Sequence, residues 1–216
     1  MNSRERIRAI MAGQAADRCG FWLGKPHGDS WPLLHKYFGT SDGNELRRKL
    51  HDDFCLIGAG VYKHPQGRSA FNLNIMQRGY GSAGIFAECE DVRQVEDYEW
   101  PNPDYLDFTE VLEYLRNDAG DYYRLSGFWS PFFHEVADFF GMENYFVKMY
   151  THPEVVHAVT RHVVDFYLEA NARFFGKSKG LVDAFFFGND FGTQRDLLIS
   201  PDLFKEFVFP YPSSTL

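Results

Sequence analysis

The stretch "LVDAFFFGNDFGTQRDLLISPDLFKEFVFPY" (Leu181–Tyr211) places a short aromatic run next to a well-marked helix. The aromatic run predicts a strand over Leu181–Gly188. Ser200 is expected as the N-cap of the helix, and Pro201 takes the first helical position. A strand followed by a returning helix is the repeating unit of an α/β fold.

The same alternation of apolar runs and helical patterns continues along the chain. Further strands are expected at Cys19–Gly24, Phe54–Gly60 and Tyr122–Trp129, with a hairpin or edge strand at Gly84–Cys89 or within Phe71–Tyr80. Helices are expected at Ser3–Gly13, Ser41–Leu50, Pro101–Asp118 and Thr151–Phe175, the last opening with a Thr–Glu capping-box spacing. This order predicts a parallel sheet.

A glycine-rich turn after one predicted strand decides between two parallel-sheet folds. Gly58 and Gly60 are present, but Lys63 stands where a dinucleotide-binding motif needs a third glycine. We therefore predict a (β/α)8 TIM barrel as a single domain over residues 1–216. Such a barrel takes about 250 residues, so this one is expected to be incomplete, with its last strands missing.

Composition excludes several classes of protein. The net charge is −8 and no Lys/Arg-rich run is present, so nucleic acid is not an expected partner. Three cysteines without a CxxC pair indicate a reducing cytoplasm. No apolar run approaches the roughly 18 residues of a membrane span. The aromatic share of 18% fits either a bulky core or a pocket for a flat ligand.

In a barrel, the residues that follow the strands form the active face. Asp190 follows the strand Leu181–Gly188 and stands among phenylalanines, so it is expected to lose hydration and act as the catalytic residue. The alternative is an Asx-turn made by Asn189 and Asp190. The pair Asp52 and Asp53 precedes its strand and is expected to cap or turn the chain.

Substrate-binding side chains are expected on the same face. The first predicted strand leads into "WLGKPHGDSW", where a cation and an imidazole beside tryptophan suit a flat anionic substrate, with a solvated loop as the alternative. "SGFWSPFFHE" offers a histidine that enters the pocket or caps a helix. The predicted substrate-binding residues are Trp22, Lys25, His27, His134, Phe191 and Gln194. No metal ligand is predicted, because His157 and His162 are five positions apart rather than four.

Four segments together resemble the uroporphyrinogen decarboxylase family. They are "GNDFGTQRDLLISPDLFKEFVFPY", "GFWSPFFHEVADFFG", "RERIRAIMAGQAADR" and "WPNPDYLDF", and the likeness extends to Tyr211. The resemblance implies a (β/α)8 barrel, tetrapyrrole chemistry and often a homodimer. Two departures stand against decarboxylase activity. The family's decarboxylating aspartate corresponds to Gly60, and its arginine-rich loop reads "GKPHGDSW" here.

The likeness is closer to the methyltransferase branch, whose members move methyl groups to or from corrinoid carriers. The resemblance implies zinc and a corrinoid in a full-length relative, with His and Cys ligands in an HxC-type motif after the Pro-Tyr helix. No cofactor is expected within this chain, because it ends before that motif. "PSSTL" does not resemble the family's continuation and suggests a C-terminal truncation.

Three hypotheses follow. The chain is an enzyme for methyl transfer involving a tetrapyrrole- or corrinoid-linked substrate, with decarboxylation of uroporphyrinogen as the alternative chemistry. It is a tetrapyrrole-binding module without chemistry. Or it is an inactive fragment, whose unpaired sheet edges invite aggregation. The expected partners are the small-molecule substrate, a corrinoid protein and a second copy of the chain.

Overall fold

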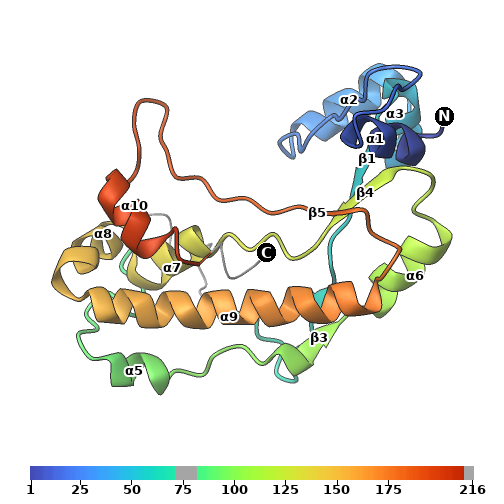
Figure 1. The fold of residues 1–216 in the computed structure, drawn as a ribbon. Helices are drawn as coiled ribbons and strands as arrows, with labels where there is room; N and C mark the ends of the chain where they lie inside the picture. Colours follow the sequence, from blue (N-terminus) through green and yellow to red (C-terminus); the bar gives the residue numbers. More distant parts are fainter. Residues whose placement is uncertain (72–81, 212–216) are drawn as a thin grey trace. The chain divides into compact units, whose positions relative to one another are not determined.

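The computed structural model describes residues 1–71 and 82–211, which form two compact units (Figure 1). The first unit comprises Met1–Ala59, Thr109–Gly127 and Lys177–Phe186, and the second comprises Gly60–Phe108, Phe128–Gly176 and the chain from Phe187 onward. That residues 1–216 form one domain stays a prediction. The strand expected within Phe71–Tyr80 falls, except for its first residue, outside the described residues.

A three-stranded parallel sheet forms the centre of the first unit. Its order is β1 (Phe54–Leu56), β4 (Tyr123–Ser126) and β5 (Ala184–Phe185), with β4 in the middle. In register, Cys55 pairs with Arg124. These strands fall within three of the predicted strand segments, but each is shorter than predicted.

Four helices belong to the first unit. They are α1 (Ser3–Met11), α2 (Ser30–Phe38), α3 (Gly43–Leu50) and α6 (Thr109–Asn117). Asn2 closes a capping box with Glu5 at the start of α1. Ile7 of α1 then packs against Tyr123 and Leu125 of β4. The helices predicted at Ser3–Gly13 and Ser41–Leu50 are thereby confirmed.

The second unit is mainly helical. Its elements are β2 (Val61–Tyr62), α5 (Val92–Glu96), the 3-10 helix η1 (Pro103–Tyr105), β3 (Leu106–Asp107), α7 (Phe132–Phe140), α8 (Met142–Thr151), α9 (Pro153–Lys177) and α10 (Pro201–Phe207). β2 and β3 form a two-stranded antiparallel ribbon. The long helix α9 contacts α7, α5 and α10, which lie on both sides of it in Figure 1.

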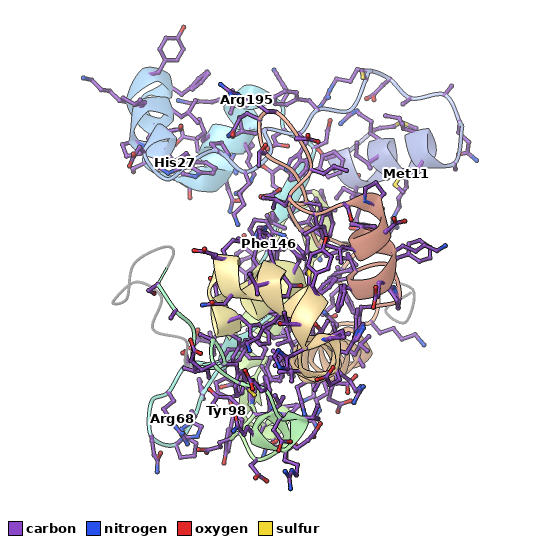
Figure 2. The ribbon with its side chains drawn as sticks, turned by 90° about the vertical axis from the view of Figure 1, so that its left-hand side faces the viewer. Met11, His27, Arg68, Tyr98, Phe146 and Arg195 are labelled. Carbon is purple, nitrogen blue, oxygen red and sulfur yellow. The ribbon has the colours of Figure 1, made fainter. Side chains whose placement is uncertain are left out.

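Aromatic side chains fill the core of the second unit. Phe133, Phe139 and Phe140 of α7 are fully buried, and Phe86 stacks on Phe139 at 5.6 Å between ring centroids. Phe146 of α8 packs against the same core (Figure 2). The buried valines of α9 recur at helical spacing, as predicted: Val155, Val159 and Val163. Many of the chain's aromatic residues therefore pack in the core, the first of the two alternatives that the composition left open.

The predicted (β/α)8 barrel, whether complete or incomplete, is wrong. Across 1–71 and 82–211, the strands form only the three-stranded sheet and the two-stranded ribbon, whereas a barrel needs eight parallel strands. The segments Cys19–Gly24 and Gly84–Cys89 form no strand. The amide of Phe86 instead donates to the carbonyl of Phe139 at 2.8 Å, which places this apolar run against a helix. An apolar run reports burial, and helices can bury it as well as a sheet can.

Two predicted helix starts also need correction. Thr151 ends α8, and its hydroxyl donates back to the carbonyl of Val147 rather than capping α9. The helix expected over Pro101–Asp118 is divided into η1, β3 and α6. The helix α10 is confirmed, because Ser200 accepts from the amide of Leu203 at 3.3 Å. Among the described residues, no helix combines the length and hydropathy of a membrane span.

Candidate functional site

The loop from Gly188 to Phe191 caps the start of α7 in the second unit. Asn189 Oδ1 accepts from the amide of Phe133 at 3.0 Å, and its amide group donates to the carbonyl of Ser130 at 3.3 Å. No side-chain cap comes from Pro131, the residue at the N-cap position of α7. Asn189, which is 56 positions from Phe133 along the chain, therefore accepts from a backbone amide at the start of α7.

His134 and Asp190 meet beside this cap. The amide of Asp190 donates to His134 Nε2 at 3.2 Å, so this ring nitrogen serves as the acceptor. The Asp190 residue is exposed, and the expected loss of hydration of its carboxylate is not observed. Phe191 is half-buried against Phe133 and Phe204, at 5.3 and 5.0 Å between ring centroids. Gln194 is exposed on the same loop.

A buried amide holds the neighbouring loop that leads into α7. Asn171 of α9 accepts from the amide of Phe128 at 2.8 Å and donates to Ser130 Oγ at 3.2 Å. Ser130 has a φ of 53°, an uncommon value for a residue other than glycine. Such strain persists where surrounding bonds impose it, and it often marks functional sites. Gly188 lies close by, where an added Cβ would stand 3.1 Å from Trp129 Nε1.

A half-buried acid follows directly after His134. Glu135 Oε1 accepts a hydrogen bond of 2.5 Å from the hydroxyl of Tyr167 on α9. Its other oxygen, Oε2, is buried and has no hydrogen-bond partner among the described residues. Burial raises the pKa of Glu135 to about 7, the bond from Tyr167 opposes this rise, and Asp138 adds to it. Glu135 therefore exchanges its proton near neutral pH.

The remaining predicted substrate-binding residues lie in the first unit. Trp22 packs against Phe54 and Phe186, with ring centroids 5.8 and 5.4 Å away. Lys25 is exposed, as is His27, whose imidazole stands 3.5 Å from a carboxylate oxygen of Asp29. Trp22 thus belongs to the packing around the sheet. Asp190, His134, Phe191 and Gln194 belong to the second unit.

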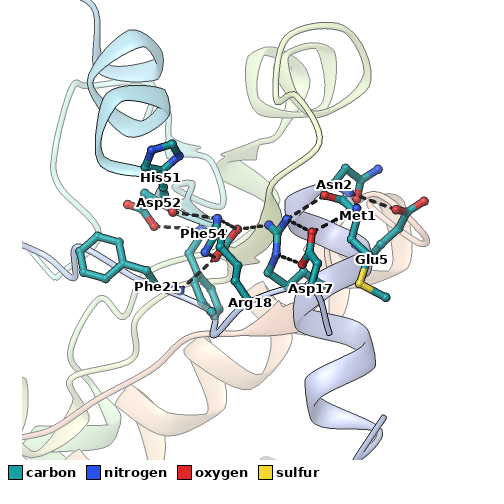
Figure 3. Close-up of polar contacts among 12 residues, drawn as sticks. Met1, Asn2, Glu5, Asp17, Arg18, Phe21, His51, Asp52 and Phe54 are labelled. Carbon is teal, nitrogen blue, oxygen red and sulfur yellow. Dashed lines mark hydrogen bonds and ion pairs between the residues drawn. The ribbon is translucent and has the colours of Figure 1, made fainter. Parts of the chain in front are cut away.

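The acid pair of the first unit has a structural role, as expected. Asp53 is fully buried and accepts from Arg6, Arg18 and the amide of Phe21 at 2.7–3.0 Å (Figure 3). Burial opposes ionisation of Asp53, but these donors outweigh it and lower its pKa. Asp52 Oδ1 accepts from the amide of Phe54 at 3.0 Å, which turns the chain into β1.

The described residues do not fit a zinc site. No three His, Cys, Asp or Glu side chains come together in residues 1–71 and 82–211. The two histidines of α9 are engaged elsewhere. His157 stacks on Phe207 at 4.6 Å, and His162 stacks on Trp100 at 4.5 Å while it contacts Glu96.

Sequence reasoning missed Glu135 and Tyr167. The signal was present, since "SPFFHEVADFF" holds an acid inside an aromatic run that is too apolar to leave it in water. The hydrogen-bond partner of Glu135 could not be predicted from the sequence, because Tyr167 stands 32 positions later on another helix.

Comparisons of the chain with family models, with curated proteins and with solved structures found no match. The resemblance to the uroporphyrinogen decarboxylase family therefore rests on the quoted motifs, and the activity that it implies is a proposal.

Proposed function

We propose that this chain takes part in methyl transfer between a corrinoid carrier and a small substrate, with Asp190 in contact with that substrate. The supporting observation is the meeting of His134 and Asp190 on the loop that carries the family-like "GNDFGTQ" motif. The cap made by Asn189 fixes this loop on α7, and the Asp190 residue is exposed, within reach of a ligand.

The proposed reaction uses the thiol sulfur of the substrate as nucleophile and Asp190 as the residue that contacts it. A thiolate, not a thiol, is the nucleophile in methyl transfer to sulfur. The carboxylate oxygens of Asp190 can accept a hydrogen bond from the thiol and so orient it, while the thiol proton passes to water. The methyl group then passes from cobalt to sulfur, leaving a thioether and a carrier reduced from cobalt(III) to cobalt(I). No step is assigned to zinc, because the described residues do not fit that ion.

The purified chain with methylcobalamin and 2-mercaptoethanol tests this proposal by the change in cobalamin absorbance. Asp190→Asn should slow the transfer about tenfold, the scale of a lost charge-assisted hydrogen bond. Asp196→Asn is the matched control, since Asp196 is an exposed acid on the same loop. Absence of transfer with the wild-type chain, or equal rates for both variants, would refute the proposal.

A second candidate is tetrapyrrole binding without chemistry, and the geometry at Gly60 favours it over decarboxylation. An added Cβ there would stand 2.7 Å from the carbonyl oxygen of Asp107 and 2.8 Å from a ring carbon of Phe108. No side chain fits where a decarboxylase carries its acid. Titration with uroporphyrin should then change its absorbance without turnover. Formation of coproporphyrinogen from uroporphyrinogen would reinstate decarboxylation.

The proposal places the chain in the cytoplasm, with a corrinoid protein and a second copy of itself as partners. Cys19, Cys55 and Cys89 are all free thiols, which suits a reducing compartment. Size-exclusion chromatography with light scattering tests the homodimer.

A further inference from the structure

A cleft of about 410 Å³ lies within the second unit, apart from the His134–Asp190 loop. Its walls come from the segment after β2 and the segment after α5, and they include Tyr62, Tyr98 and Tyr105. Its charged lining residues include Arg68, which Figure 2 shows near Tyr98. The volume falls within the range of small-molecule sites, roughly 300–1,000 Å³.

Ring contacts hold one wall of the cleft in place. Tyr62 meets Tyr105 edge to face at 5.9 Å and stacks over His64 at 6.3 Å between ring centroids. The hydroxyl of Tyr62 accepts from the amide of Asn102 at 3.1 Å. A wall fixed in this way loses little conformational freedom when a ligand binds.

Arg68 presents a cation that a ligand can recruit. Its two terminal nitrogens donate to the carboxylate of Glu99, and the side chain of Glu99 is 67% exposed. Its Nε is buried and has no hydrogen-bond partner in the described part of the chain. An exposed ion pair contributes little free energy, so another carboxylate can replace Glu99 at low cost.

His64 is surrounded by donors. The amide of Gln66 points at Nδ1 from 3.1 Å, and Arg68 Nη2 lies 3.0 Å from Nε2. A neutral imidazole has one acceptor nitrogen, so it cannot accept from both groups. When Nδ1 accepts from Gln66, the Nε2 hydrogen faces the guanidinium of Arg68. One acceptor oxygen between Nε2 and Arg68 would satisfy both donors.

We propose that this cleft binds a small planar carboxylate. The carboxylate replaces Glu99 at the flat guanidinium of Arg68, accepts from His64 Nε2, and leaves the ring of the ligand against the tyrosine walls. Two coplanar oxygens match the guanidinium fork better than a tetrahedral anion does. A dianion is disfavoured, because Asp97 and Glu99 also line the cleft. This site is independent of the function proposed above.

Calorimetric titration of the full chain with benzoate tests the proposal, with benzamide as the neutral analogue and inorganic phosphate as the tetrahedral anion. Benzoate should bind, and Arg68→Gln should weaken it about tenfold or more, as expected for loss of a charge-assisted bond. Glu99→Gln should tighten benzoate binding, because it releases Arg68. Arg93→Gln is the matched control, since Arg93 pairs with Asp91 on α5 in the same way.

Several outcomes would overturn the proposal. They are no saturable benzoate binding up to its solubility, equal affinity for benzamide, or phosphate binding as strong as that of benzoate. Unchanged affinity in Arg68→Gln would also overturn it. A thermal melt shows whether Arg68→Gln folds. If that variant unfolds, Glu99→Gln decides, and equal or weaker benzoate binding would then refute the site.

Discussion

Each unit shields one acid from water, and the hydrogen-bond partners of the two acids differ. Asp53 is fully buried, whereas Glu135 is half-buried with one fully buried oxygen. Asp53 in the first unit accepts from several donors, among them Arg6, Arg18 and the amide of Phe21. Glu135 in the second unit has one donor, Tyr167, and a buried oxygen that has no partner among the described residues. The pKa of Asp53 is lowered and that of Glu135 is raised to about 7. The hydrogen-bond donors around a shielded acid therefore decide its state. With several donors the acid stays charged and stabilises the fold, and with few it holds an exchangeable proton.

The largest expected effect comes from breaking the paired acid. Asp53→Asn removes the carboxylate that Arg6 and Arg18 share, while Arg6 keeps its bonds to Asp17. Removal of one partner of a buried pair costs about 3–5 kcal/mol, and the retained Asp17 places the expected loss at the lower of these values. Urea unfolding measures the loss. Asp91→Asn is the control, because Asp91 pairs with an arginine that is 87% exposed, and it should cost under about 1 kcal/mol. Equal costs would mean that burial of the first pair is irrelevant.

The same acid predicts an acid-labile first unit. The folded-state pKa of Asp53 is lowered, so its stabilisation is fully present above the unfolded-state pKa of aspartate. The stabilisation is lost as the pH falls through the folded-state value. Asp53→Asn should remove this part of the acid sensitivity, which unfolding between about pH 2 and pH 5 would measure.

A second test introduces an aspartate at Gly60. Gly60→Asp recreates the decarboxylase acid of the family, but Gly60 has a φ of 153° and no room for a Cβ. Strain of this kind costs about 1–3 kcal/mol, and the contact with the Asp107 carbonyl adds to it. The variant should therefore lose stability without gaining activity. Gly58→Ala is the control, since no atom lies within 4 Å of its added Cβ.

Local signals in the sequence predicted local structure well. Ser200 and Pro201 start α10 as expected, because a cap and a fixed φ act within one helical turn. The barrel was wrong because closure of a sheet depends on distant pairing that a short apolar run does not specify. The apolar runs Cys19–Gly24 and Gly84–Cys89 form no strand, and Phe86 of the second run packs against Phe139 of α7 instead.

The candidate site shows the same limit. Asp190 and His134 were both predicted as site residues from the sequence. In the structure the backbone amide of Asp190 lies 3.2 Å from His134 Nε2. It could not predict that Asn189 caps α7, since these groups are 56 positions apart. It also predicted that Asp190 is desolvated, whereas Asp190 is exposed and Glu135 is the half-buried acid.

The half-paired acid predicts a pH dependence of opposite sign to that of Asp53. The folded-state pKa of Glu135 is raised from 4.5 to about 7, so the folded state holds a proton that the unfolded state has released. The free energy of unfolding should fall between about pH 4.5 and pH 7 by roughly 3 kcal/mol. Glu135→Gln should abolish this fall and be more stable than the wild type at pH 8.

The partner of Glu135 provides the control for that experiment. Tyr167→Phe removes the single donor to the carboxyl group, so ionisation should become harder and the fall should extend to higher pH. A wild-type free energy of unfolding that is constant from pH 5 to pH 8 would contradict the interpretation of Glu135 as an exchangeable acid.

The smallest effects belong to the two neighbours on the loop, and they separate structure from function. Asn189→Ala removes the cap of α7 and should cost about 1 kcal/mol, measured by urea unfolding. Asp190→Asn should change stability by less than about 0.5 kcal/mol, because His134 contacts the backbone amide of Asp190 and that contact survives the substitution. A larger loss for Asp190→Asn would show that the carboxylate is structural. Asp190 would then stabilise the fold, as Asp53 does, rather than contact a substrate.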